Sequence, residues 1–433
     1  MKKILIIIII ILILPKVFAQ DLQIPDMIKN LTDQSFQKYP KVLEMQDLVH
    51  LSEIRVSLNK AGFFPIANGN VSYTRLYPTD PIAITLGPKI IDFQIVPADN
   101  YNVGVTLVQP IINLKTSANI NKSKSDMTAS IDNLENFKLQ LAYQVAQIYY
   151  GIVFLNKSLH VQRQQLDLIQ TNIRQIEAKV KNGDALTYDL VSMQVRYTNV
   201  ENFYTDLQNQ INKQYNLLNM LCGNSESITI SDTTIIDKGF DIETDSIFAM
   251  AVVNNPDIKI ANDNIESARL DLVSTSRDQL PSLNMLAGTG YRNGFMPDVF
   301  TTRFNYYVGV SLNIPIFSSS RPGYQRKIAL VNLNASRSAL ETQQITLNKD
   351  ILNALEDVKK NKNKLAGSDT LIMQATLALR LATDRYKNGV ITTLELLTAQ
   401  TNYQDALLSR LQYEYNLLLA KMEINRLTGK RWW

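Results

Sequence analysis

The chain contains the same unit twice, and this internal duplication constrains its fold more than any other feature. Residues in the first half reappear in the second half at an offset of 205 or 206 positions. The matching segments are 101–111 with 306–316, 181–183 with 387–389, 194–197 with 400–403, and 219–223 with 425–429. A near-constant offset over so long a stretch is typical of a repeated structural unit. We therefore predict two structural repeats, residues 20–223 and 224–433, with the same order of helices and strands.

Each repeat is predicted to run from a helix through two short strands into a very long helix and then a further helix. Pro65 and Pro281 end the first helix, because proline disfavours helical backbone in the residue before it. Gly183 and Gly389 end the long helices, as glycine often does. In the first repeat we expect a helix at about 40–62, strands at about 66–77 and 100–110, and helices at about 113–182 and 185–222. In the second we expect a helix at about 256–278, strands at about 282–292 and 303–314, and helices at about 318–388 and 391–428.

The predicted strands carry one apolar face and one face of small or polar residues. In residues 306–314, tyrosine, valine, leucine and isoleucine occupy the even positions, and glycine, serine and asparagine occupy most of the odd ones. Residues 102–107 repeat this alternation. A period of two is typical of a strand with one apolar face, and a tilted strand of about 9–11 residues crosses a bilayer. The pattern favours a membrane barrel with its apolar face outside.

Four short strands cannot close a barrel by themselves. An open edge in lipid leaves unpaired backbone groups that each cost several kcal/mol. We therefore expect three copies of the chain to supply twelve strands, with long helical hairpins shared between subunits as a tunnel. The predicted fold class is mainly α with a membrane β-barrel that is completed in a trimer.

The first residues are predicted to be a secretory signal peptide. Lys2 and Lys3 precede an unbroken apolar run of 11 residues, 4–14, and residues 17–19 suit a signal peptidase, with cleavage after Ala19. A retained membrane anchor is the alternative, but the run is too short for a hydrocarbon core of about 30 Å. Residues 1–19 are therefore expected to leave the mature chain.

Composition argues against several classes of function. The formal charge of +4 falls towards neutral once the signal peptide is removed, so a nucleic-acid surface is not expected. The only cysteine is Cys222, and the only histidines, His50 and His160, fall in no metal-binding or Ser-His-Asp pattern. We therefore predict no catalytic, cofactor-binding or metal site, and no enzyme.

Taken together, these features resemble the outer-membrane efflux protein family, the TolC-like exit ducts, over essentially the whole mature chain. The resemblance rests on the duplication, on the strand–Pro–long-helix order after Gly104 and Gly309, and on residues 386–389 followed by 394–397. It implies a homotrimer in the outer membrane with a 12-stranded barrel and a periplasmic helical tunnel that closes like an iris. It also implies partners: outer-membrane lipid, a periplasmic adaptor (membrane fusion protein), and an inner-membrane pump driven by protons or ATP.

The resemblance also implies site residues near the two helix turns. Glu395 and Asp189 match positions where acidic residues form rings that narrow the entrance, and clustered carboxylates favour cations in a pore. The position of a second acid, one turn later, is Thr398. The alternative for these acids is a helix-capping role, because negative charge is favoured at a helix start.

Tyr386 matches a position that latches the closed iris, although the family's latching arginine is replaced here by Ile391. Simple packing is the alternative role for this tyrosine. The predicted adaptor-docking tips are Lys181, Asn182, Gly183, Lys387, Asn388 and Gly389. Loops at 78–100 and 293–302 are expected to face outside the cell, because they contain turn residues. Trp432 and Trp433 are interpreted as a tail.

Two other functions remain open at this stage. The same duct could serve type I protein secretion instead of multidrug efflux, because nothing in the duct sequence selects the substrate. A periplasmic coiled-coil scaffold or adhesin stalk would explain the helices. It would not explain why alternating apolar and polar strands recur at the same place in each repeat.

Overall fold

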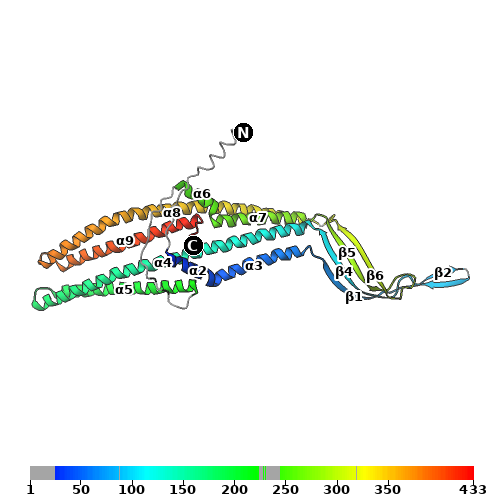
Figure 1. The fold of residues 1–433 in the computed structure, drawn as a ribbon, viewed down its shortest axis with the longest axis horizontal. Coiled ribbons are helices and arrows are strands. Elements are labelled where there is room, and N and C mark those ends of the chain that lie inside the picture. Colours follow the sequence, from blue (N-terminus) through cyan, green and yellow to red (C-terminus); the bar gives the residue numbers. More distant parts are fainter. Residues whose placement is uncertain (1–24, 87, 224–227, 229, 231–243, 318) are drawn as a thin grey trace, which may run out of the picture. The chain divides into compact units, whose positions relative to one another are not determined.

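The computed structural model describes residues 25–86, 88–223, 228, 230, 244–317 and 319–433. The predicted signal peptide, 1–19, lies outside the described residues. The chain divides into two compact units. Figure 1 labels the helices and strands of both. One comprises the described residues within 1–46, 132–259 and 341–433, and the other comprises 47–131 and 260–340.

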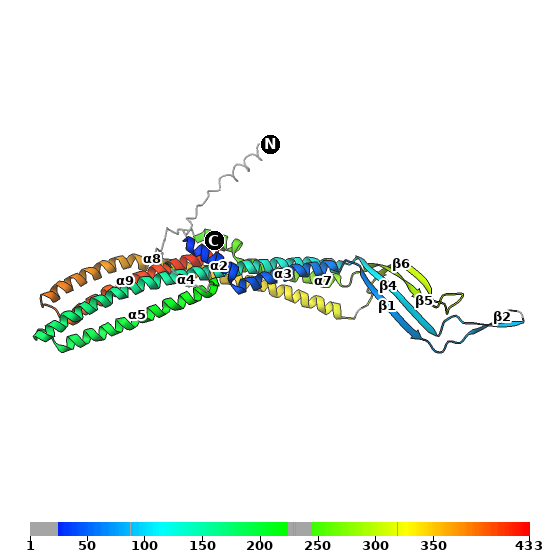
Figure 2. The ribbon, with the colours of Figure 1, turned by 60° about the horizontal axis from the view of Figure 1, so that its bottom comes forward.

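The unit of residues 47–131 and 260–340 contains a four-stranded antiparallel sheet. Its strands are β1 (Ile66–Arg75), β4 (Asp99–Ile112), β5 (Ser282–Arg292) and β6 (Arg303–Asn313), in the order β1-β4-β5-β6. Figure 2 shows the same strands side by side from a second direction. The two repeats are joined by the β4–β5 pairing, in which Val105 lies opposite Thr289. Strands β1 and β6 are edges, each paired on one side only within the described chain.

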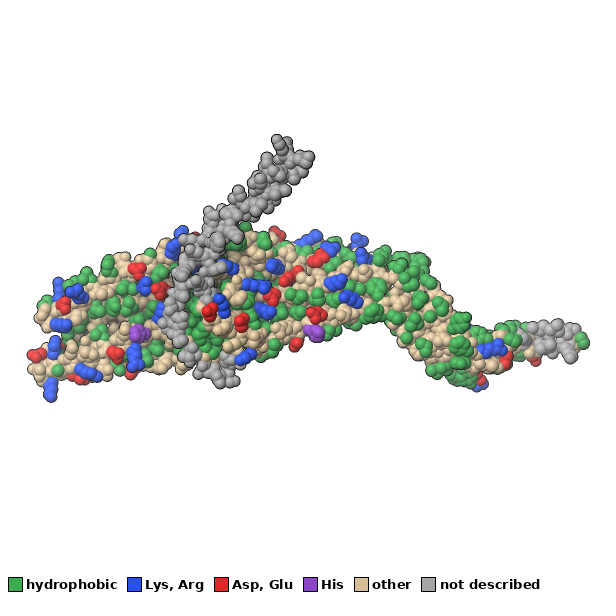
Figure 3. Space-filling view, in the orientation of Figure 1, with side chains coloured by type: hydrophobic (Ala, Val, Ile, Leu, Met, Phe, Trp, Pro, Cys, Tyr) green, Lys and Arg blue, Asp and Glu red, His purple; other side chains and the backbone are tan. Residues whose placement is uncertain are grey.

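The strand register places most of the apolar residues of the four strands on one face. Across the sheet, Val71 lies opposite Val103, which in turn lies opposite Tyr291, and Met285 lies opposite Val310. Many of these side chains are more than half exposed, including Val71 at 78% and Val310 at 67%. The space-filling view shows hydrophobic side chains gathered over the strands (Figure 3). The alternation read from the sequence is therefore a sheet with one unpartnered apolar face.

A further hairpin lies in the segment that the sequence analysis assigned to a loop at 78–100. Strands β2 (Ile82–Leu86) and β3 (Lys89–Phe93) pair with each other in a separate two-stranded sheet. The sequence contains a local signal for this hairpin, because two short runs rich in isoleucine lie on either side of turn residues. The same unit includes β-proximal parts of helices α3 (Pro40–Ala61), α4 (Leu114–Asn182), α7 (Pro256–Arg277) and α8 (Arg321–Lys387).

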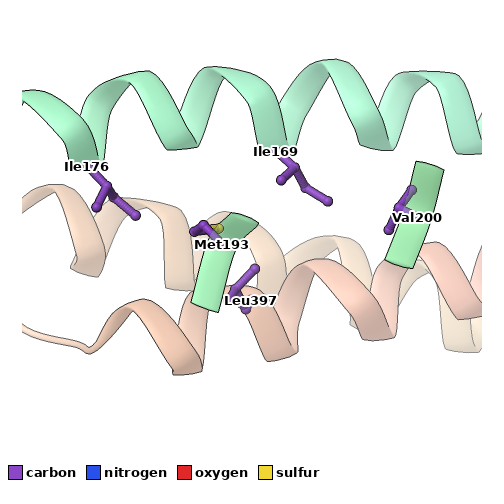
Figure 4. Close-up of a cluster of buried hydrophobic side chains, with 5 residues drawn as sticks. All are labelled: Ile169, Ile176, Met193, Val200 and Leu397. Atoms are coloured by element: carbon purple, nitrogen blue, oxygen red, sulfur yellow. The ribbon is translucent and has the colours of Figure 1, made fainter. Parts of the chain in front are cut away.

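The other unit is built on two helical hairpins. The first joins α4 to α5 (Thr187–Cys222), and the second joins α8 to α9 (Thr393–Leu427). Figure 4 shows Leu397 of α9 directed towards a buried cluster that comprises Ile169 and Ile176 of α4 and Met193 and Val200 of α5. The two repeats thus share one core in this unit. No helix of the described chain is apolar over enough of its length to cross a membrane.

Two short helices were not predicted from the sequence. They are α2 (Asp26–Lys38) and α6 (Thr244–Asn254), and each precedes the first predicted helix of its repeat. Gly223 ends α5 with φ +61, and a Cβ placed there would lie 2.7 Å from the Cβ of Lys38 in α2. Gly429 follows α9 with φ +65, and its Cβ would lie 2.3 Å from the carbonyl oxygen of Asn254 in α6. In each repeat, a glycine with left-handed backbone therefore packs directly against the end of the short helix.

The C-terminal residues pack against helices from the first repeat and do not form a free tail. Arg431 makes an ion pair with Glu135 of α4 at 2.9 Å. The Trp432 ring meets Tyr143 edge-on at 6.2 Å between centroids, and the Trp433 ring meets Phe36 of α2 at 5.8 Å. Aromatic pairs in this geometry are stabilising. The two tryptophans thus fasten the end of the second repeat to the first.

Candidate channel entrance

The turns between the paired helices have the same backbone geometry in both hairpins. Gly183 and Gly389 adopt φ +84 and +70, and nothing lies within 4 Å of a Cβ built at either. The amide of Asp184 donates to the carbonyl of Lys179 at 2.8 Å, and the amide of Val390 donates to that of Arg385 at 2.9 Å. This six-to-one bond satisfies a carbonyl at the helix end and requires a left-handed residue. The lysine and asparagine before each glycine are exposed.

Apolar side chains project into solvent just after each turn. Leu186 and Tyr188 are 69% and 73% exposed, and Val390 and Leu394 are each 68% exposed. Tyr188 and Leu394 occupy equivalent positions, 206 residues apart. Large apolar side chains that gather on an exposed surface commonly mark a contact with another protein. The turns therefore present apolar residues beside the predicted docking residues.

Glu395 caps helix α9. Its carboxylate accepts a hydrogen bond from the amide of Thr392 at 2.8 Å, and the Thr392 hydroxyl accepts from the amide of Glu395 at 3.3 Å. This reciprocal pair is a capping box. The bond from the Thr392 backbone, followed by that from its hydroxyl, lowers the pKa of the Glu395 carboxyl below its ordinary value. The capping role considered from the sequence is thus present, and it leaves the carboxylate exposed and ionised at neutral pH.

Asp189 and Thr398 differ from Glu395 in their surroundings. Asp189 is half-buried in the first turn of α5. The N-cap residue of this helix, Leu186, makes no side-chain hydrogen bond to the helix. Its carboxylate stabilises the helix start through the helix dipole alone. Thr398 is exposed, and its hydroxyl donates to the carbonyl of Leu394 at 2.8 Å. As a threonine it places no charge one turn after Glu395.

Tyr386 connects three helices at this end of the unit. The Nζ atom of Lys179, near the end of α4, lies 4.6 Å from the centre of the tyrosine ring. The hydroxyl of Thr393, at the start of α9, donates to the Tyr386 hydroxyl at 3.4 Å. A cation over an aromatic face is attracted by the ring quadrupole. The ring therefore links the first hairpin to the second within one chain.

A row of buried polar side chains continues this link between the hairpins, and no pattern in the sequence predicted it. The amide of Gln404 in α9 donates to Gln162 of α4 at 2.6 Å. Asn172 of α4 donates to Gln400 at 3.4 Å, and Arg196 of α5 donates to Gln404 at 3.5 Å. Gln400 recurs at the repeat offset from Gln194, but its partner could not be read from spacing. Buried amides that bond one another favour one specific packing arrangement over others.

Comparisons with known proteins agree with this architecture. The sequence pattern of the outer membrane efflux protein family matches residues 31–224 and 248–430. The chain is 19% identical over 340 residues to the outer membrane efflux protein BepC of Brucella suis, covering 77% of this chain and 74% of that protein. It is 20% identical over 343 residues to the alkaline protease secretion protein AprF of Pseudomonas aeruginosa, covering 75% and 69%. Its fold matches the outer membrane protein VceC of Vibrio cholerae with a TM-score of 0.78 at 15% identity, covering 94% and 96%.

The chain belongs to the outer membrane efflux protein family. The family resemblance, the outer-membrane location and the role as an exit duct that is not an enzyme are confirmed. The predicted fold class is confirmed as mainly helical with a four-stranded antiparallel sheet. The roles of the individual entrance residues remain predictions.

Replacement of Tyr386 by alanine is expected to loosen the link between the hairpins, and replacement by phenylalanine is not. A cation–π contact is worth about 0.5–2 kcal/mol and needs only the ring face. Hydrogen exchange at the amides of residues 383–395 should therefore accelerate by roughly two- to thirtyfold in Tyr386→Ala. Lys179→Gln is the matched change on the other partner. If Tyr386→Phe exchanges as fast as Tyr386→Ala, the hydroxyl and not the ring maintains the contact.

Proposed function

We propose that the protein is one subunit of a trimeric outer-membrane channel that serves as the exit duct of a tripartite export system. The observation that carries this proposal is the open sheet with an exposed apolar face and two unpaired edges, β1 and β6. In a membrane both edges must be paired. Pairing β6 of one copy with β1 of the next gives twelve strands from three copies. The apolar face then meets lipid, and the polar face lines the lumen.

Aromatic residues on the apolar face support this orientation in a bilayer. Tyr73 and Tyr101 lie 5.3 Å apart between ring centroids, and Tyr291 and Phe304 lie 5.5 Å apart. The register places all four on the apolar face near the loop ends of the strands. Girdles of aromatic residues at the membrane interface are a general feature of outer-membrane barrels. We assign this girdle to the outer interface.

The helix turns form the periplasmic end of the duct in this proposal. Three copies of Glu395 and of Asp189 would surround the threefold axis and attract cations into a narrow entrance. The exposed residues Tyr188 and Leu394, with the adjacent turns 181–183 and 387–389, would dock a periplasmic adaptor and an inner-membrane pump. The contact between Lys179 and Tyr386 would hold the hairpins together in the closed state.

Single-channel recording in planar bilayers tests this proposal. The purified wild type is expected to form small cation-selective channels, and Glu395→Ala and Asp189→Ala are each expected to lower that selectivity.

The lowered pKa of Glu395 keeps its carboxylate charged below the pH at which an ordinary glutamate is protonated, so its contribution to cation selectivity should persist in mildly acidic buffer. Glu395→Gln with Thr392 retained is the control that removes charge with little change in side-chain size. Channels with unchanged selectivity would contradict the entrance assignment, and a protein that forms no channels would contradict the duct.

Protein secretion is a second candidate, and one relative favours it. AprF is an alkaline protease secretion protein, whereas BepC is an efflux protein, and both are similar to this chain over comparable lengths. The two functions differ in the cargo that crosses the same duct. Deletion of the gene distinguishes them: loss of a secreted polypeptide from the medium supports secretion, and accumulation of small toxic compounds in cells supports efflux.

A further inference from the structure

Two arginines face each other at the loop end of the sheet. Arg292 is the last residue of β5, and Arg303 is the first residue of β6. They are direct partners in the antiparallel register, so both side chains leave the same face of the sheet. Arg292 is exposed and Arg303 is half-buried.

That face is the polar one. Counting by twos from the arginines leads to Gly290 and Gly288 on β5 and to Asn305 and Tyr307 on β6. The register extends the same face to Asn102 of β4, which pairs with Arg292. Within the four strands of this sheet, no other charged residue lies on the polar face, because Arg75 and Asp99 pair on the apolar side. The polar face therefore carries its only charge at this end, and that charge is positive.

Among the described residues, no carboxylate forms an ion pair with either arginine. Like charges opposite each other on neighbouring strands are destabilising. Arg292 lies over the ring of Phe295, 4.6 Å from its centre. Asp298 interacts electrostatically with Arg303, but its carboxylate accepts hydrogen bonds from the amide of Phe300 at 3.0 Å and from the Thr301 hydroxyl. Neither arginine forms an ion pair with any residue that the structure describes.

We propose that Arg292 and Arg303 form an anion-binding site at the outer mouth of the channel, which attracts carboxylate or phosphate groups of the exported cargo. This inference rests on the proposed function, because the polar face becomes the lumen only when three copies close the barrel. Closure would bring six arginines, two from each copy, to the rim of the lumen. Guanidinium groups match carboxylate and phosphate geometry in a bidentate manner, and rings of arginine select anions in pores.

The site would act on the last part of the export path. Fixed positive charge raises the local concentration of anions over about one Debye length, which is about 10 Å at 0.1 M salt. The residues that precede Arg292 on this face, Gly288 and Gly290, have no side chain, and Arg292 itself is exposed. Tyr307 lies against Gly288 and gives the same surface an aromatic face. A cargo with an anionic group and an apolar body would meet both features there.

Planar-bilayer recording with Arg292→Gln/Arg303→Gln tests the site. Reversal potentials in a low-salt potassium chloride gradient report the chloride-to-potassium permeability ratio. The double variant is expected to lower this ratio by at least about twofold at low salt, and the difference should vanish near 1 M salt because of screening. Tripolyphosphate is the probe anion, and it should reduce the wild-type current only from the side of the β5–β6 loop. Each measurement is repeated with Glu395→Ala/Asp189→Ala so that the entrance does not dominate selectivity.

Two controls separate charge from structure. Arg75→Gln removes an arginine from the opposite face at the same end of the sheet, and its permeability ratio should equal that of the wild type. Arg292→Lys/Arg303→Lys retains the charge and should retain the ratio. Normal channels from the glutamine double variant with unchanged ratio and unchanged tripolyphosphate block would overturn the inference. Absence of channels from the wild type would overturn the proposed function and the lumen assignment with it.

Discussion

Val310→Arg is expected to prevent stable insertion of the protein into the outer membrane, whereas Ser311→Arg is expected to be tolerated. The two residues are neighbours in the middle of β6 and lie on opposite faces of the sheet. Val310 is on the apolar face and is 67% exposed in the single chain. An arginine on the lipid face near the bilayer midplane costs about 2–4 kcal/mol, and a trimer would bear that cost three times. In the proposed barrel Ser311 would face the lumen, where a charged side chain remains in water.

The measurement is the amount of heat-stable trimer recovered from the outer-membrane fraction. We expect Val310→Arg to reduce it by at least about tenfold, which corresponds to about 1.4 kcal/mol, and Ser311→Arg to leave it near the wild-type level. The same pair of changes also tests which face is which. If Ser311→Arg abolishes the trimer and Val310→Arg does not, the polar face is not the lumen and the barrel assignment is wrong.

Gly429→Ala is expected to destabilise the fold far more than Gly389→Ala. Both glycines have left-handed backbone, with φ +65 and +70, so both substitutions incur the conformational cost of about 1 kcal/mol. They differ in what the added methyl group meets. At Gly389 nothing lies within 4 Å, whereas at Gly429 the carbonyl oxygen of Asn254 would lie 2.3 Å away. Overpacking of this kind costs about 1–3 kcal/mol in addition.

The clash at Gly429 also affects a buried hydrogen-bond set. Asn255 is 2% exposed, and its amide donates to the carbonyl of Leu427 at 2.9 Å while its oxygen accepts from the amide of Asp257 at 2.9 Å. Displacing α9 from α6 would strain these bonds together. Thermal unfolding of the detergent-solubilised protein at one scan rate measures the effect, because comparison at equal rate is valid even when unfolding is irreversible. Equal losses of thermal stability in the two variants would show that the contact with Asn254 does not constrain α9.

Much of the fold could be predicted from local periodicity. The alternation in 306–314 is a property of neighbouring residues, and the structure contains β6 at Arg303–Asn313. The long helices contain few internal breakers and end at left-handed glycines, which are also local signals. The helices α2 and α6 had no such support, because they lie outside the segments that match between repeats. Their position depends on contacts with Gly223 and Gly429, which are distant in sequence.

At the candidate entrance, too, the sequence predicted the residues but not their contacts. Position after each turn glycine identified Glu395 and Asp189, but only the structure shows that Glu395 is bound within a capping box while Asp189 is not. The partner of Tyr386 is Lys179, more than 200 residues earlier in the chain, and no spacing rule connects them. The C-terminal tryptophans likewise contact Phe36 and Tyr143, which the sequence could not associate with them.

The sequence by itself determined the duplication, the membrane-length strands with one apolar face, the helical hairpins and their turns. Each of these is encoded by residues that are close together in the chain, through steric and hydrophobic periodicity. The tertiary structure alone decided which residues meet across the sheet and between the hairpins. The opposition of Arg292 and Arg303 depends on the register of β5 and β6, and a shift of one residue would send one arginine to the other face. Register arises from many weak contacts acting together, so it becomes definite only when the whole sheet has formed.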